Sequence, residues 1–112
     1  MNISYEEIGH VSVTFPAGTG TAGKVCKLDS NGNAAACSVG ERFCGIVEHV
    51  GSAGAAVQIH GFAVVSFTGT AFVPGYVKLS ANGSGGVKSD ENGTAYLVAQ
   101  VDTAAKTAVI EL

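Results

Sequence analysis

Apolar and polar residues alternate in short runs along most of this chain, and this pattern predicts β-strands. Four runs are expected in the first half, at residues 24–29, 34–38, 43–50 and 56–60. Four more are expected in the second half, at residues 76–80, 86–89, 94–102 and 107–112. Helical periodicity is confined to about one turn at residues 4–8. The pattern therefore predicts an all-β protein.

The two sets of predicted strands belong to an internal duplication. When residues 25–59 are laid over residues 76–110 without a gap, nine of the 35 pairs are identical, including Asn31/Asn82, Gly32/Gly83 and Val47/Val98. Many short strands at regular spacing, separated by glycine-rich turns, are typical of small antiparallel folds. We therefore expect a small antiparallel β-barrel or sandwich built from two tandem similar units.

Asn-Gly dipeptides mark the same turn in both copies, at residues 31–32 and 82–83. Asn-Gly favours positive φ at both central residues of a two-residue type I′ hairpin turn. A phosphate-binding loop is disfavoured, because none of these glycines opens a predicted helix and no phosphate-binding motif is present. The repeated Asn-Gly segment is therefore expected to form a structural turn rather than a binding or catalytic site.

Alternation along the longer strands assigns one face to the core and the other to solvent or a partner. The expected core residues are Cys44, Ile46, Val50, Val57 and Ile59, with Ala95, Leu97, Val101, Ala108 and Ile110 in the second copy. The opposite face would carry Val47, His49, Gln58, His60, Tyr96, Val98, Gln100 and Glu111. Glu48 breaks the pattern, because it falls on the core face where the second copy has Ala99. A buried carboxylate needs a partner, so we expect Glu48 at a barrel end or in an inter-subunit pair with Arg42 or a lysine.

Residues 1–21 lie outside the aligned copies and are expected to form an N-terminal arm and linker, followed by a single β-barrel domain at residues 22–112. The arm ends in a Pro/Gly/Thr-rich stretch that is typical of a flexible linker. Within the arm, Val11, Val13 and Phe15 alternate with polar residues. This pattern could add one strand to a sheet edge, either of this chain or of a neighbour.

The stretch between the two copies contains a strand with two apolar faces. Phe62 and Val64 share one face, while Ala63, Val65 and Phe67 share the other. Such a strand is either central to the core or covered on one side by another subunit, and the sequence leaves both alternatives open.

Composition favours strands and a weak core. The chain has 15 Val against 4 Leu, and β-branched residues fit a pleated surface. It also has 16 Gly and 16 Ala, so that each buried position removes little apolar area from water. A partner surface would therefore help such a fold.

Charge and cysteine usage narrow the possible partners and compartments. A net charge of -3 gives no basic field for the phosphates of a nucleic acid. No run approaches the roughly 18 apolar residues of a membrane span, and the first ten residues are too polar for a signal peptide. Three cysteines, an odd number, suit a reducing compartment such as a cytoplasm. We expect a soluble chain that is not exported and that binds neither nucleic acid nor membrane.

The cysteines give no metal-binding pattern. A two-residue turn at 31–32 would place Cys26 directly opposite Cys37, where a disulfide is geometrically awkward, and small buried apolar residues are the plainer interpretation. The spacing C-x10-C-x6-C contains no CxxC pair, which disfavours zinc.

The histidines give no catalytic pattern. His49 and His60 would lie about 13 Å apart on one hairpin, too far to share a metal. Cys44 would point away from both, which disfavours a nucleophile and base pair, and His10 is isolated in the arm. We therefore expect no catalytic residue, no metal and no cofactor.

Four segments carry a resemblance to a known family. The segments "AGKVCKLDSNGNAAAC", "ERFCGIVEHV", "AAVQIHGFAVV" and "PGYVKLSANGSGGVK" resemble the small β-barrel capsid decoration, or head-stabilising, proteins of tailed bacteriophages. The resemblance covers about residues 20–112. It rests on a repeated order of strands and turns, not on a catalytic signature.

The resemblance implies a structural role in a virion. Such proteins form homotrimers on the outside of the expanded capsid, where they cement neighbouring subunits of the major capsid protein, after synthesis in the cytoplasm of the host bacterium. The arm would be ordered on binding by strand addition, with capsid contacts from Ile3, Tyr5, Ile8, Val11, Val13 and Phe15. The subunit interface would contain Phe62, Val64, Val65, Phe67 and Phe72.

Two other classes of function make different predictions. Another virion or surface β-module, such as a tail, spike or carbohydrate-binding barrel, would present exposed aromatic rings in a groove. A cysteine-dependent hydrolase would have a rapidly alkylating Cys44.

Overall fold

Ten β-strands joined by short turns make up residues 9–112, the part of the chain that this computed structural model describes. The first half contains β1 (Val11–Phe15), β2 (Val25–Leu28), β3 (Ala34–Ala36), β4 (Gly45–Gly51) and β5 (Gly54–His60). The second half contains β6 (Phe62–Thr68), β7 (Gly75–Ala81), β8 (Val87–Ser89), β9 (Thr94–Asp102) and β10 (Thr107–Glu111). The prediction of an all-β fold is confirmed. The described residues include no helix of the length and apolarity that a membrane span requires.

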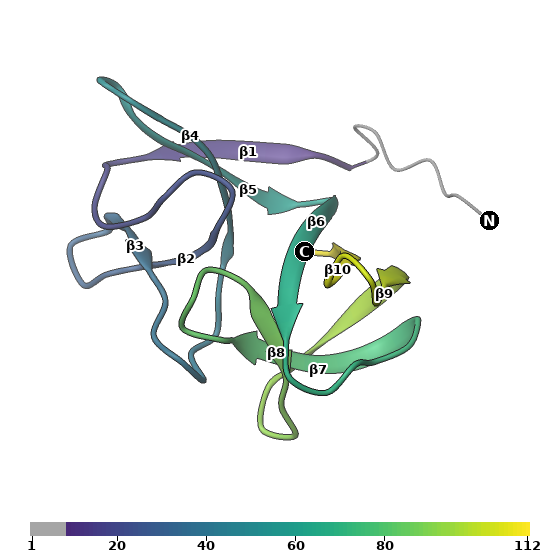
Figure 1. The fold of residues 1–112 in the computed structure, drawn as a ribbon. Helices are drawn as coiled ribbons and strands as arrows, with labels where there is room; N and C mark the ends of the chain where they lie inside the picture. Colours follow the sequence, from purple (N-terminus) through teal and green to yellow (C-terminus); the bar gives the residue numbers. More distant parts are fainter. Residues whose placement is uncertain (1–8) are drawn as a thin grey trace.

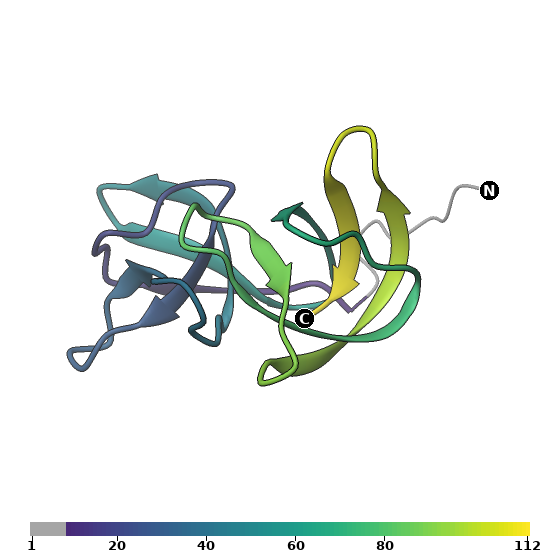
Figure 2. The same ribbon diagram turned by 60° about the horizontal axis from the view of Figure 1, so that its bottom comes forward.

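Each half of the chain forms its own five-stranded sheet (Figures 1 and 2). The first sheet has the order β1-β5-β4-β2-β3. The second has the order β6-β10-β9-β7-β8 and closes into a small barrel, because β6 also pairs with β8. When the strands of each half are numbered from one to five along the chain, both sheets have the order 1-5-4-2-3. The expectation of two similar units is therefore confirmed.

The duplication extends beyond the strands that the sequence identities cover. β1 pairs antiparallel with β5, as β6 does with β10. A parallel bridge joins Ala17 to Ala34 in the first half, as parallel pairing joins β6 to β8 in the second. The first half is therefore an almost closed counterpart of the barrel. β1 belongs to the sheet of its own chain.

A β-bulge occurs at the same place in both units. In the β4–β5 ladder Val47 pairs with Val57 and His49 with Ala56, so Glu48 is the extra residue. In the β9–β10 ladder Val98 pairs with Ile110 and Gln100 with Val109, so the extra residue is Ala99. These are the two positions that the ungapped alignment places together.

The Asn-Gly hairpin differs from the predicted two-residue turn. Leu28 pairs with Ala34, and the backbone N–H of Asp29 donates to the carbonyl of Asn33 at 3.0 Å. The turn therefore has three residues, of which only Gly32 has positive φ, at 79°. The carboxylate of Asp29 holds this turn by accepting from the backbone N–H groups of Asn31 and Asn33.

This longer turn changes the pairing of the cysteines. Cys26 lies opposite Ala36, not opposite Cys37 as the two-residue turn predicted. All three cysteines are free. The prediction was wrong because one additional turn residue shifts every pair of the hairpin by one position.

Two apolar clusters stabilise the molecule. The larger lines the barrel and includes residues of the first half: Val25, Cys37, Phe43 and Ile46. The smaller lies inside the first sheet and contains Cys26, Ala34, Val47, Ala55 and Val57. Both faces at the start of β4 are therefore covered, one by each cluster.

Because both faces of β4 are covered at its start, the predicted assignment of core and solvent faces is only partly correct. Ile46, Val57, Ala108 and Ile110 are buried as expected, but Cys44 and Val50 are exposed. Val47, Gln58 and Val98 are buried, contrary to the prediction. The bulges at Glu48 and Ala99 end the simple alternation, since each inserts one residue without a partner.

Backbone hydrogen bonds join the two halves. Val25 N–H donates to the carbonyl of Gly85 at 3.0 Å, and Gly40 N–H donates to that of Ala81 at 2.8 Å. Ala81 N–H in turn donates to the carbonyl of Glu41 at 2.9 Å. Together with the shared apolar cluster, these bonds fix the first sheet against the barrel.

Candidate functional site

β1 presents an apolar surface at the edge of the first sheet. It lies at the end of the strand order, and its side chains Val11 and Val13 are 43% and 36% exposed. Phe15 is half-buried against the smaller apolar cluster. The other predicted arm residues, Ile3, Tyr5 and Ile8, lie outside the described residues. Val11 and Val13 are thus the described part of the predicted arm surface that a partner can reach.

Apolar side chains are also exposed or half-buried on the outside of the barrel, on β6, β7 and β9. Tyr76 on β7 is 79% exposed and pairs with Leu97 on β9, which is half-buried. Val64 on β6 is 47% exposed, and Phe62 on the same strand is half-buried. The name outer barrel face is used below for these four residues.

The other residues of the predicted subunit interface point into the barrel. Val65, Phe67 and Phe72 are buried, and the rings of Phe67 and Phe72 contact each other with centroids 4.8 Å apart. β6 therefore has one core face and one largely exposed face, and it is not buried on both faces within this chain. Phe62 and Val64 are the predicted interface residues that remain available to a partner.

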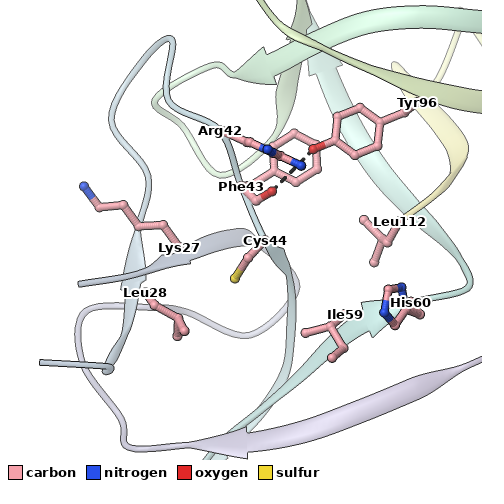
Figure 3. A pocket seen from close by; sticks show the side chains of 9 residues that line it. All are labelled: Lys27, Leu28, Arg42, Phe43, Cys44, Ile59, His60, Tyr96 and Leu112. Atoms are coloured by element: carbon pink, nitrogen blue, oxygen red, sulfur yellow. Dashed lines mark hydrogen bonds between the residues drawn. The ribbon is translucent and has the colours of Figure 1, made fainter. Parts of the chain in front are cut away.

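A groove of about 490 Å³ opens where the first sheet meets the barrel (Figure 3). Cys44 lies between its two walls, and the ammonium group of Lys27 points away from the thiol. The residues that line the groove are Lys27, Leu28, Arg42, Phe43, Cys44, Ile59, His60, Tyr96 and Leu112.

The two aromatic rings that line this groove stack on each other. Phe43 and Tyr96 stack with centroids 4.8 Å apart and planes 9° from parallel. The hydroxyl of Tyr96 donates to the backbone carbonyl of Phe43 at 3.3 Å. Burial raises the pKa of Tyr96. One face of the half-buried Tyr96 ring is therefore covered, and Phe43 is buried, so the groove offers little aromatic surface to a sugar.

Cys44 is the exposed cysteine and has the lowest pKa of the three thiols. A hydrogen bond with the Cys26 thiol lowers the pKa of Cys44 to about 7. The same hydrogen bond, together with burial, raises the pKa of Cys26, and burial raises that of Cys37 to about 11. Of the three thiols, Cys44 therefore forms the thiolate most readily at neutral pH, while the two buried thiols stay protonated.

Cys44 and His60 line the same groove, whereas the sequence predicted that they point to opposite faces. The difference arises because Cys44 lies before β4 begins and does not follow the alternation of that strand. No hydrogen bond between the two side chains is found among the described residues. A thiol nucleophile therefore has no base positioned beside it.

His10, Ser12 and Glu48 form a polar cluster on the surface of the first sheet. His10 Nε2 lies 3.0 Å from Ser12 Oγ and 3.1 Å from a carboxylate oxygen of Glu48, and Ser12 Oγ donates to the other oxygen. His10 is therefore not isolated, and Glu48 is exposed on the sheet surface and does not lie on the core face where the alternation placed it. The bulge turns Glu48 out of the core towards β1.

This cluster does not have the geometry of a catalytic triad. In a triad the acid binds one imidazole nitrogen and the nucleophile the other, so that the acid orients the base. Here Ser12 and Glu48 contact the same nitrogen of His10. Within residues 9–112 there is also no group of three or more His, Cys, Asp or Glu side chains that could hold a metal.

Two structural residues of this region were missed from the sequence. Gln58 is buried, and its amide donates to the backbone carbonyls of His60 and Phe62 where β5 turns into β6. Lys27 donates to both carboxylate oxygens of Glu41, at 2.9 and 2.7 Å. The Lys27–Glu41 contact joins segments 14 residues apart, and the Gln58 contacts depend on how β5 turns into β6, so no local pattern predicted either.

The described residues define an all-β protein with a duplicated five-stranded unit, two exposed apolar surfaces and one groove that contains a reactive thiol. No protein-family model, no curated protein and no solved structure matches this chain. Its function is therefore inferred from its own surface and from the resemblance given above.

Proposed function

We propose that this protein binds the outer surface of a tailed-bacteriophage capsid as a trimer and stabilises the lattice of the major capsid protein. The observation that carries the proposal is the exposed apolar side chain pair on β1, an edge strand that directly follows the N-terminal residues. An exposed edge strand is a template for strand addition by another chain. In this role β1 and the residues before it pair with the capsid, while the rest of the chain acts as a rigid body.

The outer barrel face supports the trimer in this proposal. Single exposed apolar residues are ordinary on protein surfaces, but Tyr76 and Leu97 are cross-strand neighbours. Tyrosine is enriched where protein interfaces are buried. Contact between outer barrel faces would supply apolar burial that a core rich in Ala and Gly lacks.

The capsid contact is tested with particles assembled from the major capsid protein of the phage genome to which the proposal assigns this gene. The double variant Val11→Asp/Val13→Asp should bind such particles at least about tenfold more weakly in co-sedimentation, because two charges would enter an apolar contact. The matched control is Val50→Asp, since Val50 is 41% exposed but lies in the β4–β5 hairpin. Equal binding by the two variants would contradict the assignment of β1, and no binding by the wild type would contradict the proposal.

The trimer is tested separately by size exclusion with light scattering. The wild type should have three times the mass of one chain, and Tyr76→Asp should shift it to the monomer. Val39→Asp is the control, because Val39 is also exposed but lies in the loop between β3 and β4. A monomeric wild type at high concentration would rule out the trimer without affecting the capsid contact.

A further inference from the structure

We propose that Cys26 and Cys44 form a redox-active dithiol. In it, Cys44 attacks a small-molecule disulfide that enters the groove, and Cys26 then completes an intramolecular disulfide. This inference is independent of the capsid role. The fold brings Cys26 close to Cys44, whereas the sequence had placed Cys26 opposite Cys37.

The backbone places the two cysteines in neighbouring positions. Cys26 lies on β2, and Cys44 immediately precedes β4, the strand that pairs with β2. The N–H of Cys44 donates to the carbonyl of Cys26 at 2.8 Å. The two thiols are also close enough to shift each other's pKa in opposite directions. Cys26 pairs with Gly45, so Cys44 is its diagonal neighbour across adjacent strands, which lie about 4.8 Å apart. A disulfide spans Cα separations of about 4.4–6.8 Å.

The two thiols differ in access, as an attacking and a resolving cysteine must. Cys44 is exposed in the wall of the groove, whereas Cys26 is 0% exposed inside the first sheet. Arg42 also lines the groove and gives it a positive charge that suits an anionic disulfide such as oxidised glutathione. A reagent in solution therefore reaches Cys44 first.

The chemistry balances with the small disulfide as the oxidant. The Cys44 thiolate attacks one sulfur of R–S–S–R, forms a mixed disulfide and releases one RS⁻. Cys26 loses its proton and attacks the Cys44 sulfur, which expels the second RS⁻. Two protein thiols are oxidised, and one small disulfide is reduced to two thiols.

Cys37 is the matched control within the same chain. It is buried in the larger apolar cluster, while Cys26 belongs to the smaller one. It follows Ala36, which is the last residue of β3 and the partner of Cys26, and its side chain packs in the larger apolar cluster. Cys37 should therefore stay reduced while the other two cysteines react.

The test treats the folded protein with oxidised glutathione near neutral pH, followed by acid quenching, denaturation and thiol counting by mass spectrometry. The wild type should fall from three free thiols to one, and Cys37→Ser should fall from two to none. Cys44→Ser should keep both of its thiols, and Cys26→Ser should stop at one bound glutathione on Cys44. The peptide map of the wild type should contain a Cys26–Cys44 cross-link.

The peptide map of the oxidised wild type tests the proposal by itself, even if Cys26→Ser does not fold. A wild type that retains glutathione on Cys44, or a cross-link that includes Cys37, would overturn the proposal. So would loss of both thiols in the Cys44→Ser variant.

Discussion

A side chain at position 45 would have no room, although the sequence shows only one glycine among sixteen. A Cβ on Gly45 would collide with the backbone carbonyl of Gln58 and lie 2.8 Å from Cγ1 of Val57. β5 can approach β4 so closely only because position 45 lacks a side chain. The sequence could not reveal this, because the contact joins two strands and leaves no local pattern.

Gly45→Ala is therefore expected to lower the free energy of unfolding by about 1–3 kcal/mol through overpacking. Gly51→Ala is the matched control on the same strand, because its Cβ would meet only the movable imidazole of His49 at 3.0 Å. The control should change stability by less than about 0.5 kcal/mol. Urea denaturation followed by circular dichroism measures both, and equal effects would contradict the close approach.

The reactivity of the three thiols gives a second prediction for single residues. Alkylation of Cys44 by iodoacetamide should rise with pH and reach half its maximal rate near pH 7, because the thiolate is the nucleophile and the pKa of Cys44 is lowered to about 7. Cys26 and Cys37 should be labelled only after unfolding, since both are buried. Peptide mass spectrometry over a pH series checks this, and faster labelling of Cys37 would contradict it.

At the scale of elements, an aspartate holds a turn of each unit. Asp29 and Asp90 both begin the sequence Asp-x-Asn-Gly, and the carboxylate of Asp90 accepts from the N–H of Asn92 and from the hydroxyl of Ser80. Three-residue hairpin loops with glycine last are the next most common after two-residue loops. The aspartate was the available signal for the longer turn, and the Asn-Gly pair alone predicted the wrong one.

These turns should make the protein sensitive to acid. Backbone N–H groups, first that of Asn33, lower the pKa of Asp29, and the Ser80 hydroxyl and Asn92 N–H lower that of Asp90, both from the ordinary value of 3.8. A carboxyl with a lower pKa in the folded state stabilises the fold above the unfolded value, and this stability is lost as the pH falls through the folded value.

The double variant Asp29→Asn/Asp90→Asn keeps the hydrogen-bond acceptors but removes the titrating groups. Its urea midpoint should therefore decline less than that of the wild type when the pH falls below 3.8. Equal declines would show that other carboxyl groups control acid unfolding. Glu41→Gln is the comparison, because Lys27 lowers the pKa of Glu41 outside either turn.

At the scale of the whole molecule, the two units are predicted to unfold together. Phe43 comes from the first half but packs in the barrel cluster and stacks on Tyr96 of β9. Phe43→Ala should cost about 3–5 kcal/mol, because it leaves a cavity between the units. Hydrogen exchange should then increase in both β4 and β9. Loss of protection in the first half alone would show that the units are independent.

The sequence predicted the repetition of strands but not how the copies associate. The nine identities and the alternation were sufficient for an all-β protein of two similar units. That each copy forms its own sheet depends on non-local contacts such as Ala17 with Ala34 and Phe67 with Val87. These pairings occur where the second sheet closes and the first nearly closes, and no local pattern encodes them.

The paired bulges mean that the chain provides its own internal comparison. Glu48 and Ala99 occupy one architectural position, in a nearly closed unit and in a closed one. Deleting either residue would remove the bulge and leave a regular ladder with the same cross-strand pairs. The two deletions would each change the free energy of unfolding. The difference between these changes would measure how much closure of a small sheet adds to stability, with solvent, temperature and chain length held constant.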